Sequence, residues 1–264
     1  MDRRVRYPAT VSGMSSPEHL APGRPGDLAG PRTIALVGID GSGKTTQARL
    51  LAAELAATGL PAVYRQNAGG RAWFGKRAVR WGRPDADALL GRRGMLLVES
   101  VLRWLSIVRT LLRRALRREI AVMDRYAFCQ YASLRARGAR PAAERRARLA
   151  YRLFPHPDVT FLLAVDPAVA QERIDRRGTD QESMEYLTAA DRAYRSLPEF
   201  PEFVVIDANG TPDQVSAAIR AGLAAATRPA APAPRRIRVR TLVLAGVPVL
   251  AGAAVLGWQL AESL

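Results

Sequence analysis

The chain has little cysteine and few aromatic residues, and each shortage excludes something. A single cysteine, Cys129, cannot form an internal disulfide, so we expect a reducing compartment. Aromatic residues make up 6% of the 264 residues and are not interleaved with a basic stripe. The net charge of +16 therefore gives no reason to expect a nucleic-acid partner. No continuous apolar stretch follows the first arginines, so we expect no secretory signal.

Lysine is also rare, and this makes one lysine conspicuous. Of 40 basic residues only Lys44 and Lys76 are lysines. Lys44 lies in the segment 38–45, Gly-Ile-Asp-Gly-Ser-Gly-Lys-Thr, which fits the G-x-x-x-x-G-K-[ST] pattern of a phosphate-binding loop. The apolar run 33–37 before it predicts a buried strand, and the leucine spacing in 46–58 predicts a helix. Strand, loop and helix in this order predict a nucleoside triphosphate site.

In such a loop, backbone N–H groups and the N-terminus of the following helix surround the polyphosphate. Lys44 is expected to reach the β- and γ-phosphates, and the Thr45 hydroxyl to hold Mg²⁺. The predicted ATP-binding residues are Gly38, Ile39, Asp40, Gly41, Ser42, Gly43, Lys44, Thr45 and Thr46.

The body of the chain alternates strands and helices. Further strands are expected at 62–65, 119–124, 159–165 and 203–207, a long helical region at 88–118 and a closing helix at 215–226. This alternation predicts an α/β fold, a P-loop three-layer sandwich with a five-stranded parallel sheet and ligands at the carboxyl ends of the strands. We expect this domain to cover residues 32–226, after a disordered leader at 1–31.

The chain changes character after residue 226. A Pro/Ala linker and a cluster of arginines occupy 227–240, and residues 241–260 carry no charge. A bilayer-spanning helix needs about 20 mainly apolar residues. We therefore expect 241–260 to be a transmembrane helix that anchors the chain by its tail to the cytoplasmic face of the cell membrane, with the arginines on the cytoplasmic side. The alternative is a helix that docks on the domain.

Two further motifs contain groups suited to phosphate chemistry. Asp124-Arg125-Tyr126 ends the third expected strand, where the acid can support Mg²⁺ and the arginine can bind an incoming phosphate with two parallel hydrogen bonds. Taken alone, it could equally be a strand-end salt bridge. The segment 172–182 is rich in arginine and suggests a mobile lid that stabilises charge during phosphoryl transfer. A solvated helix face is the alternative there.

Together these motifs resemble thymidylate kinase over roughly residues 32–226. The family's P-loop, Gly-x-Asp-Gly-x-Gly-Lys-Thr-Thr, is matched at 38–46, and its strand-end Asp-Arg-Tyr/His at 124–126. Its Arg-x-x-Arg-Gly lid is approximated within 173–178, and its Ile-Asp-Ala ending is matched at 206–208. The resemblance implies an ATP-dependent nucleoside-monophosphate kinase, most simply one that converts dTMP to dTDP with Mg²⁺, and it leaves a homodimer open.

The resemblance also implies roles for individual residues. The catalytic group is expected to be Lys44, Arg125, Arg173, Arg176 and Arg177. Acceptor binding is expected from Asp40, Arg65, Phe74, Arg103 and Arg125, with Arg103 and Arg125 on the acceptor phosphate. The metal is expected at Thr45 and Asp124.

The acceptor half departs from the family pattern. Gly41 stands where some members carry a P-loop arginine, so the lid would have to supply the catalytic cation. Residues 65–70 read Arg-Gln-Asn-Ala-Gly-Gly instead of Arg-Glu-Pro-Gly-Gly, and Cys129 stands for a serine. A tyrosine and a glutamine expected near the base are missing, although Phe74 and Tyr131 are aromatic side chains suited to stacking. Two alternatives therefore remain, a kinase of another phosphorylated acceptor and a membrane-tethered nucleotide-binding module without kinase activity.

Overall fold

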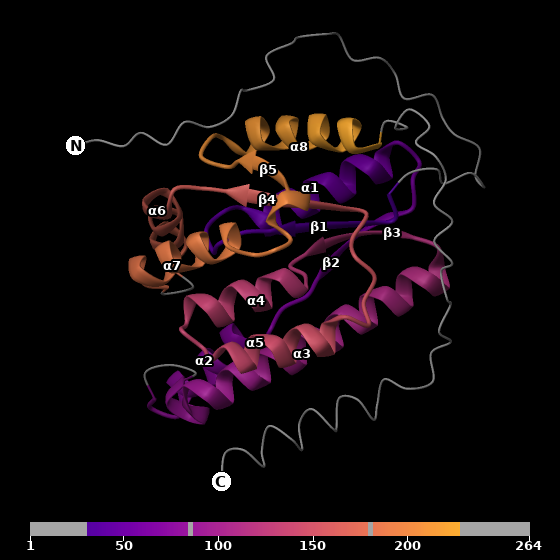
Figure 1. Ribbon diagram of the computed structural model, residues 1–264. Helices are drawn as coiled ribbons and strands as arrows, with labels where there is room; N and C mark the ends of the chain where they lie inside the picture. Colours follow the sequence, from indigo (N-terminus) through magenta and orange to yellow (C-terminus); the bar gives the residue numbers. More distant parts are fainter. Residues whose placement is uncertain (1–30, 84–86, 179–181, 228–264) are drawn as a thin grey trace.

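The computed structural model of the chain describes residues 31–83, 87–178 and 182–227 (Figure 1). The predicted leader lies almost wholly outside these residues, as do 228–240 of the predicted linker and the predicted span 241–260. Within the described ranges, no helix is both long enough and apolar enough to cross a bilayer.

Five parallel strands form the centre of the fold. They are β1 (Thr33–Val37), β2 (Ala62–Gln66), β3 (Ile120–Asp124), β4 (Val159–Ala164) and β5 (Val204–Asp207), in the order β2-β3-β1-β4-β5. All four pairings are parallel, and Leu36 of β1 lies level with Asp124 of β3 and Phe161 of β4. This confirms the predicted five-stranded parallel sheet, and each expected strand is within one residue of its observed bounds.

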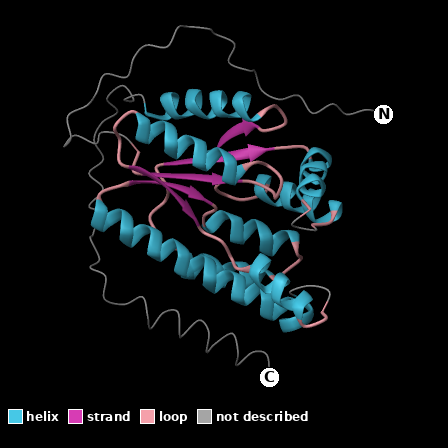
Figure 2. Ribbon diagram, turned by 180° about the vertical axis from the view of Figure 1, so that it is seen from behind, coloured by secondary structure: helices cyan, strands magenta, loops and turns pink. Residues whose placement is uncertain are grey.

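Helices cover both faces of the sheet (Figures 1 and 2). One face carries α1 (Lys44–Ala57) and α8 (Pro212–Thr227), and the other carries α3 (Asp87–Arg117), α4 (Ala127–Ala136) and α5 (Pro141–Tyr151). The remaining helices are α2 (Arg71–Arg80), α6 (Pro167–Arg177), α7 (Met184–Arg195) and the 3₁₀ turn η1 (Phe200–Glu202). Because helices cover β1, β3 and β4 on both sides, every residue of these three strands is buried.

Two helix boundaries have local causes. The long helix α3 is interrupted at Gly91, whose φ of 68° and ψ of 160° are not helical. Helix α8 begins at Pro212, three residues before the expected start. Thr211 and Gln214 form a reciprocal cap there, because the Thr211 N–H donates to Gln214 Oε1 and the Gln214 N–H to Thr211 Oγ1.

Candidate functional site

The loop between β1 and α1 has the tight form that phosphate binding requires. Gly41 has a φ of 83°, and a Cβ there would lie 2.4 Å from the carbonyl oxygen of Ala170 in α6. Only glycine fits such a position without displacing the neighbouring backbone. A side chain at residue 41 would therefore require α6 to move away from the loop.

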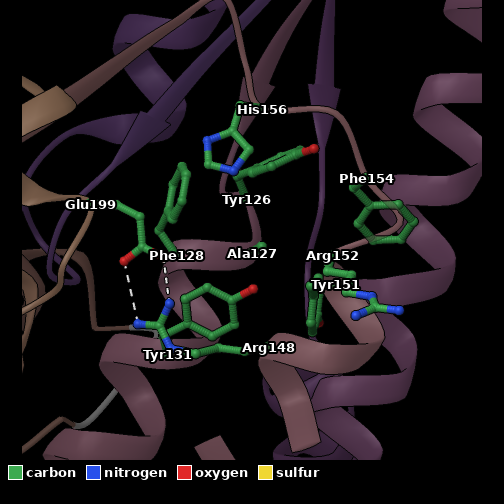
Figure 3. A pocket seen from close by; sticks show the side chains of 10 residues that line it. All are labelled: Tyr126, Ala127, Phe128, Tyr131, Arg148, Tyr151, Arg152, Phe154, His156 and Glu199. Carbon is green, nitrogen blue, oxygen red and sulfur yellow. Dashed lines mark hydrogen bonds and ion pairs between the residues drawn. The ribbon is translucent and has the colours of Figure 1, made fainter. Parts of the chain in front are cut away.

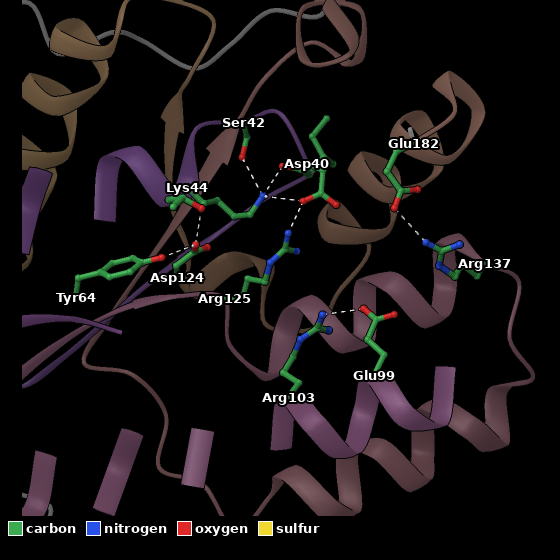
Figure 4. A network of polar contacts seen from close by, with 12 residues as sticks. Asp40, Ser42, Lys44, Tyr64, Glu99, Arg103, Asp124, Arg125, Arg137 and Glu182 are labelled. Atoms are coloured by element: carbon green, nitrogen blue, oxygen red, sulfur yellow. Dashed lines mark hydrogen bonds and ion pairs between the residues drawn. The ribbon is translucent and has the colours of Figure 1, made fainter. Parts of the chain in front are cut away.

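Lys44 is folded over this loop (Figure 4). Its Nζ donates to the Ile39 carbonyl oxygen at 2.5 Å and to Ser42 Oγ at 3.5 Å, and lies 3.6 Å from Asp40 Oδ1. The side chain is buried, and this burial lowers the pKa of the ammonium group although Asp40 acts in the opposite direction. Lys44 is therefore a desolvated cation at the place where a bound polyphosphate would lie.

A second cation, Arg125, meets the same carboxylate. Its Nη2 donates to Asp40 Oδ1, and its backbone has a φ of 77°, which is left-handed and uncommon for a residue other than glycine. Burial favours the neutral form of Asp40, yet the Arg125 and Lys44 cations outweigh it and hold the pKa of that carboxyl well below its usual range. The Asp40 carboxylate in turn raises the pKa of Arg125 well above its ordinary value.

Asn67 supports the turn that presents Arg125. Its backbone N–H donates to the Asp124 carbonyl oxygen at 2.9 Å and its Nδ2 to the Arg125 carbonyl oxygen at 2.8 Å. Its Oδ1 accepts from Thr110 Oγ1 at 3.0 Å, and the residue is fully buried. Position 67 was noted in the sequence only as a departure from the family pattern, and this supporting role was not foreseen.

One carboxylate oxygen of Asp124 accepts hydrogen bonds, and the other accepts none from the described residues. Its Oδ2 accepts from Thr45 Oγ1 at 2.6 Å and from the Tyr64 hydroxyl at 3.3 Å. Its Oδ1 is buried and has no hydrogen-bond partner among the described residues. A buried, unsatisfied carboxylate oxygen beside a threonine hydroxyl suits a divalent cation that takes its other ligands from phosphates and water. The residues at this position therefore fit a metal.

Arg103 lies below Arg125, between α3 and α4 (Figure 4). It is buried and donates from Nη1 to Gln130 Oε1 at 2.7 Å and from Nη2 to Glu99 Oε1 at 2.8 Å. Burial opposes its charge, but Glu99 raises the pKa of the guanidinium above its ordinary value. Glu99 and Gln130 were not foreseen as neighbours of the site. The i, i+4 spacing of Glu99 and Arg103 is the one sequence signal that pointed to this pair.

Of two further predicted acceptor residues, Arg65 is paired outside the cluster around Asp40, and the acceptor role of Phe74 stays a prediction. Arg65 donates from Nε to Glu119 Oε1 at 3.0 Å, and because Glu119 precedes β3 this pairing draws the guanidinium away from Asp124 at the strand's other end. Phe74 belongs to α2 and packs edge-on against Trp73, with ring centroids 4.8 Å apart. The structure therefore does not bring Arg65 into the cluster around Asp40.

Tyr131 lines a cavity of about 230 Å³ together with Tyr151 and Arg148 (Figure 3). The Arg148 guanidinium lies 4.3 Å from the centroid of its ring. Tyr126 also lines this cavity, and its hydroxyl donates to the Pro155 carbonyl oxygen at 2.5 Å. The Tyr131 ring is buried and packs among Phe128 and Tyr151, so stacking of this ring on a base stays a prediction.

The three predicted lid arginines differ in their contacts. Arg173 donates to the carbonyl oxygens of Ala208, Asn209 and Gly210 at 2.8–3.1 Å, so it fastens α6 to the loop after β5. Arg176 is 72% exposed and pairs with Glu172, one turn earlier, at 2.6 Å. Arg177 donates to the Arg173 carbonyl oxygen at 3.3 Å. Of the three, Arg173 has a structural partner outside its own helix.

The chain is similar in sequence to known proteins. The family model described as thymidylate kinase matches residues 36–219. The chain is 30% identical to a thymidylate kinase of Xylella fastidiosa over 194 residues, which cover 70% of this chain and 86% of that protein. It is 30% identical to a probable thymidylate kinase of Archaeoglobus fulgidus, covering 71% of this chain and 92% of that protein, and 28% identical to one of Pyrobaculum aerophilum, covering 70% and 92%. Because the match extends from β1 into α8 and takes in most of each relative, the chain belongs to the thymidylate kinase family.

Proposed function

We propose that this chain catalyses the ATP-dependent phosphorylation of dTMP to dTDP, with Mg²⁺ accompanying the ATP. The reaction follows the name of the family and of its aligned relatives. The residues proposed to contact the phosphates match the family pattern, and the departures lie elsewhere in the acceptor half.

The observation that carries the proposal is the pair of cations on one carboxylate. Lys44 Nζ and Arg125 Nη2 both approach Asp40 Oδ1. A triphosphate on Lys44 and a monophosphate on Arg125 would therefore lie side by side. Transfer between two phosphates depends mainly on such positioning and on charge stabilisation.

In the proposed reaction, an oxygen of the acceptor phosphate attacks the γ-phosphorus, and the bond from that phosphorus to the bridging oxygen of ADP breaks. Lys44 and the loop N–H groups stabilise the charge on the transferring and leaving oxygens. Asp40 stays ionised, because its pKa is held low, and it orients the two cations instead of moving a proton. Arg103 assists Arg125 from the wall of the acceptor site.

The metal and the lid complete the proposed site. Thr45 and Asp124 would hold Mg²⁺, which supplies charge neutralisation on the phosphates. Because Ala170 leaves no room for a side chain at Gly41, the remaining cation would come from the lid region, where Arg176 and Arg177 contact only their own helix among the described residues. Arg173 instead fixes the loop at 208–210, which we assign to the donor-base side.

ATP consumption by the full chain across dTMP, dUMP, dCMP and dGMP tests the proposal, with the diphosphate product identified by chromatography. We expect dTMP to give the highest kcat/KM. A higher kcat/KM for another monophosphate would mean that the chain is a kinase of a different acceptor. Tight ATP binding without turnover of any of the four monophosphates would mean that the chain is a nucleotide-binding module without kinase activity.

We also propose that residues 241–260 anchor the chain to a membrane, with the domain on the cytoplasmic side. The support is in the sequence alone, since this run is uncharged, has the length of a bilayer span and follows Arg235, Arg236, Arg238 and Arg240.

A further inference from the structure

The cavity of about 230 Å³ that Tyr131 lines has a mainly aromatic wall, contributed by α4, α5 and the loop after α5 (Figure 3). The buried rings of this wall are Tyr126, Phe128, Tyr131, Tyr151 and Phe154. Neighbouring rings meet close to edge-on, with interplanar angles of 73° between Phe128 and Tyr131, and 87° between Tyr131 and Tyr151. The wall therefore offers both ring faces and ring edges to a planar ligand.

One hydrogen-bond donor of the wall has no partner. The Tyr131 hydroxyl points into the cavity in Figure 3 and forms no hydrogen bond with any described residue, although Tyr131 is only 5% exposed. Burial raises the pKa of Tyr131, with the Arg148 guanidinium acting in the opposite direction, so this phenol stays protonated and can donate. The hydroxyls of Tyr126 and Tyr151 already donate to backbone carbonyl oxygens. A buried donor left without a partner indicates that something else accepts from it.

Two arginines line the cavity, and only one of them is neutralised. Arg148 is paired with Glu144 and with Glu199. Arg152 is exposed and forms no ion pair with any described residue. Among the described residues, its positive charge therefore remains available to an anionic group of a ligand in the cavity.

The size and the wall of the cavity suit a ring better than a cluster of water. A buried water needs about 2–4 polar partners, and most polar groups of this wall are already bound. A dry cavity of about 150 Å³ is large enough for benzene. A cavity of about 230 Å³ can therefore hold one aromatic ring with a small substituent.

The cavity faces a different side of α4 from the proposed acceptor site. Phe128 and Tyr131 are three residues apart and share one side of the helix, whereas Gln130, which accepts from Arg103, lies on another. Neither Arg103 nor Asp40 lines the cavity. A ligand in the cavity would therefore leave the space around Asp40 open to nucleotides.

We propose that this cavity binds a small monocyclic aromatic acid of the benzoate type. The ring packs among the buried rings of the wall, where edge-to-face contacts are favourable. The carboxylate accepts from the Tyr131 hydroxyl and is attracted by Arg152, and both interactions are strengthened by its charge. This binding does not depend on the proposed kinase activity.

Calorimetric titration of the full chain with benzoate, in the absence of nucleotide, tests the proposal. We expect saturable binding with a Kd of about 0.1–1 mM, which is reasonable for a ligand of this size. Benzyl alcohol keeps the ring without the charge, and cyclohexanecarboxylate keeps the charge without the aromatic ring. We expect each of them to bind about three- to tenfold more weakly than benzoate.

Three variants identify the groups responsible. Tyr131→Phe removes only the unpartnered hydroxyl and should weaken benzoate binding about three- to tenfold. Arg152→Gln should weaken the binding of benzoate and leave that of benzyl alcohol unchanged. Arg145→Gln, at an exposed position of α5 that does not line the cavity, is the matched control and should change neither. The Tm shows whether each variant is folded, and the exposed Arg152 carries the test if Tyr131→Phe is not.

Several results would overturn the proposal. One is the absence of saturable binding to the folded chain at up to about 10 mM benzoate. Another is unchanged benzoate affinity in folded Tyr131→Phe and Arg152→Gln, and a third is equal affinity for benzyl alcohol and benzoate. Displacement of benzoate by dTMP would assign the binding to the acceptor site instead of the cavity.

Discussion

The buried environment of Lys44 in the phosphate-binding loop disfavours its charged form, and this predicts how stability and activity respond when the residue is replaced. Burial lowers the pKa of Lys44, so the folded protein disfavours the ammonium group that it contains. Lys44→Met removes that charge and keeps most of the volume. We expect kcat to fall by about 10²–10³ because the moving phosphoryl group loses its cation. The Tm should stay equal or rise, and near-normal turnover in a folded variant would remove the loop from the mechanism.

Arg125 combines a functional guanidinium with a strained backbone. Arg125→Lys keeps a positive charge but loses the bidentate fork, so we expect a higher KM for the acceptor at an unchanged Kd for ATP. Arg125→Gly is the matched control, because glycine adopts the observed φ of 77° freely. It should regain about 1–2 kcal/mol of backbone strain, partly offset by the lost contact with Asp40, while acceptor binding fails. Loss of ATP affinity with intact acceptor binding would reverse the assignment of the two cations.

The side chains that the sequence revealed are those whose position in a motif fixes their neighbours. Asp124 ends β3, Arg125 follows it, and Lys44 begins the helix after β1, so a parallel sheet brings all three to one edge. Asn67 and Gln130 contribute through contacts between separate elements, and no spacing along the chain predicts such contacts. Arg65 shows the converse, because the family resemblance implied acceptor binding and only the fold shows its pairing with Glu119.

The phosphate-binding loop and α6 meet through a close backbone contact at Gly41. Gly43 lies in the same loop without such a contact, so substitution of the two glycines measures what the contact contributes. Both Gly41 and Gly43 have left-handed backbones, but a Cβ at Gly41 would collide with Ala170 of α6 whereas one at Gly43 meets nothing within 4 Å. Gly43→Ala should therefore cost only backbone strain, about 1–2 kcal/mol. Gly41→Ala should add a displacement of α6 and lower both ATP affinity and Tm clearly further. Equal Tm values for the two variants would show that α6 does not pack on the loop as described.

Helix α6 carries one arginine, Arg173, that binds another part of the fold and one, Arg176, that is exposed. Arg173→Ala leaves three carbonyl oxygens in the loop at 208–210 without their donor, so we expect a raised KM for ATP and a lower Tm. Arg176→Ala removes an exposed i, i+4 pair with Glu172 and should change stability by no more than about 0.5 kcal/mol. A large loss of kcat in Arg176→Ala at unchanged stability would identify it as the lid cation. Steady-state kinetics and thermal unfolding of both variants decide between these outcomes.

The order of the strands was less predictable than their existence. Alternating apolar runs and helical segments predicted a parallel sheet, because a parallel pair needs a crossover helix. They did not predict that β3 lies between β1 and β2, which is what brings Arg125 next to a loop more than 80 residues earlier in the chain. Pairing across such distances depends on which helix faces fit together in three dimensions. The Thr-x-x-Gln pattern at Thr211 and Gln214 does predict a helix start, and we did not use it to place the beginning of α8.

At the scale of the whole chain, the candidate membrane anchor 241–260 and the arginines before it act by different forces, and the two forces respond differently to salt. An apolar span at 241–260 is held by the hydrophobic effect, so the full chain should sediment with membranes and resist high-salt extraction. The arginines before it act by charge, at about 1 kcal/mol each near an anionic leaflet, and salt weakens that attraction. Deletion of residues 241–264 keeps these arginines and should convert salt-resistant association into salt-sensitive association. Replacing Arg235, Arg236, Arg238 and Arg240 by glutamine in the full chain is the complementary control and should leave the salt resistance intact. If the truncated chain still resists extraction by salt, the anchor lies elsewhere and the tail has another role.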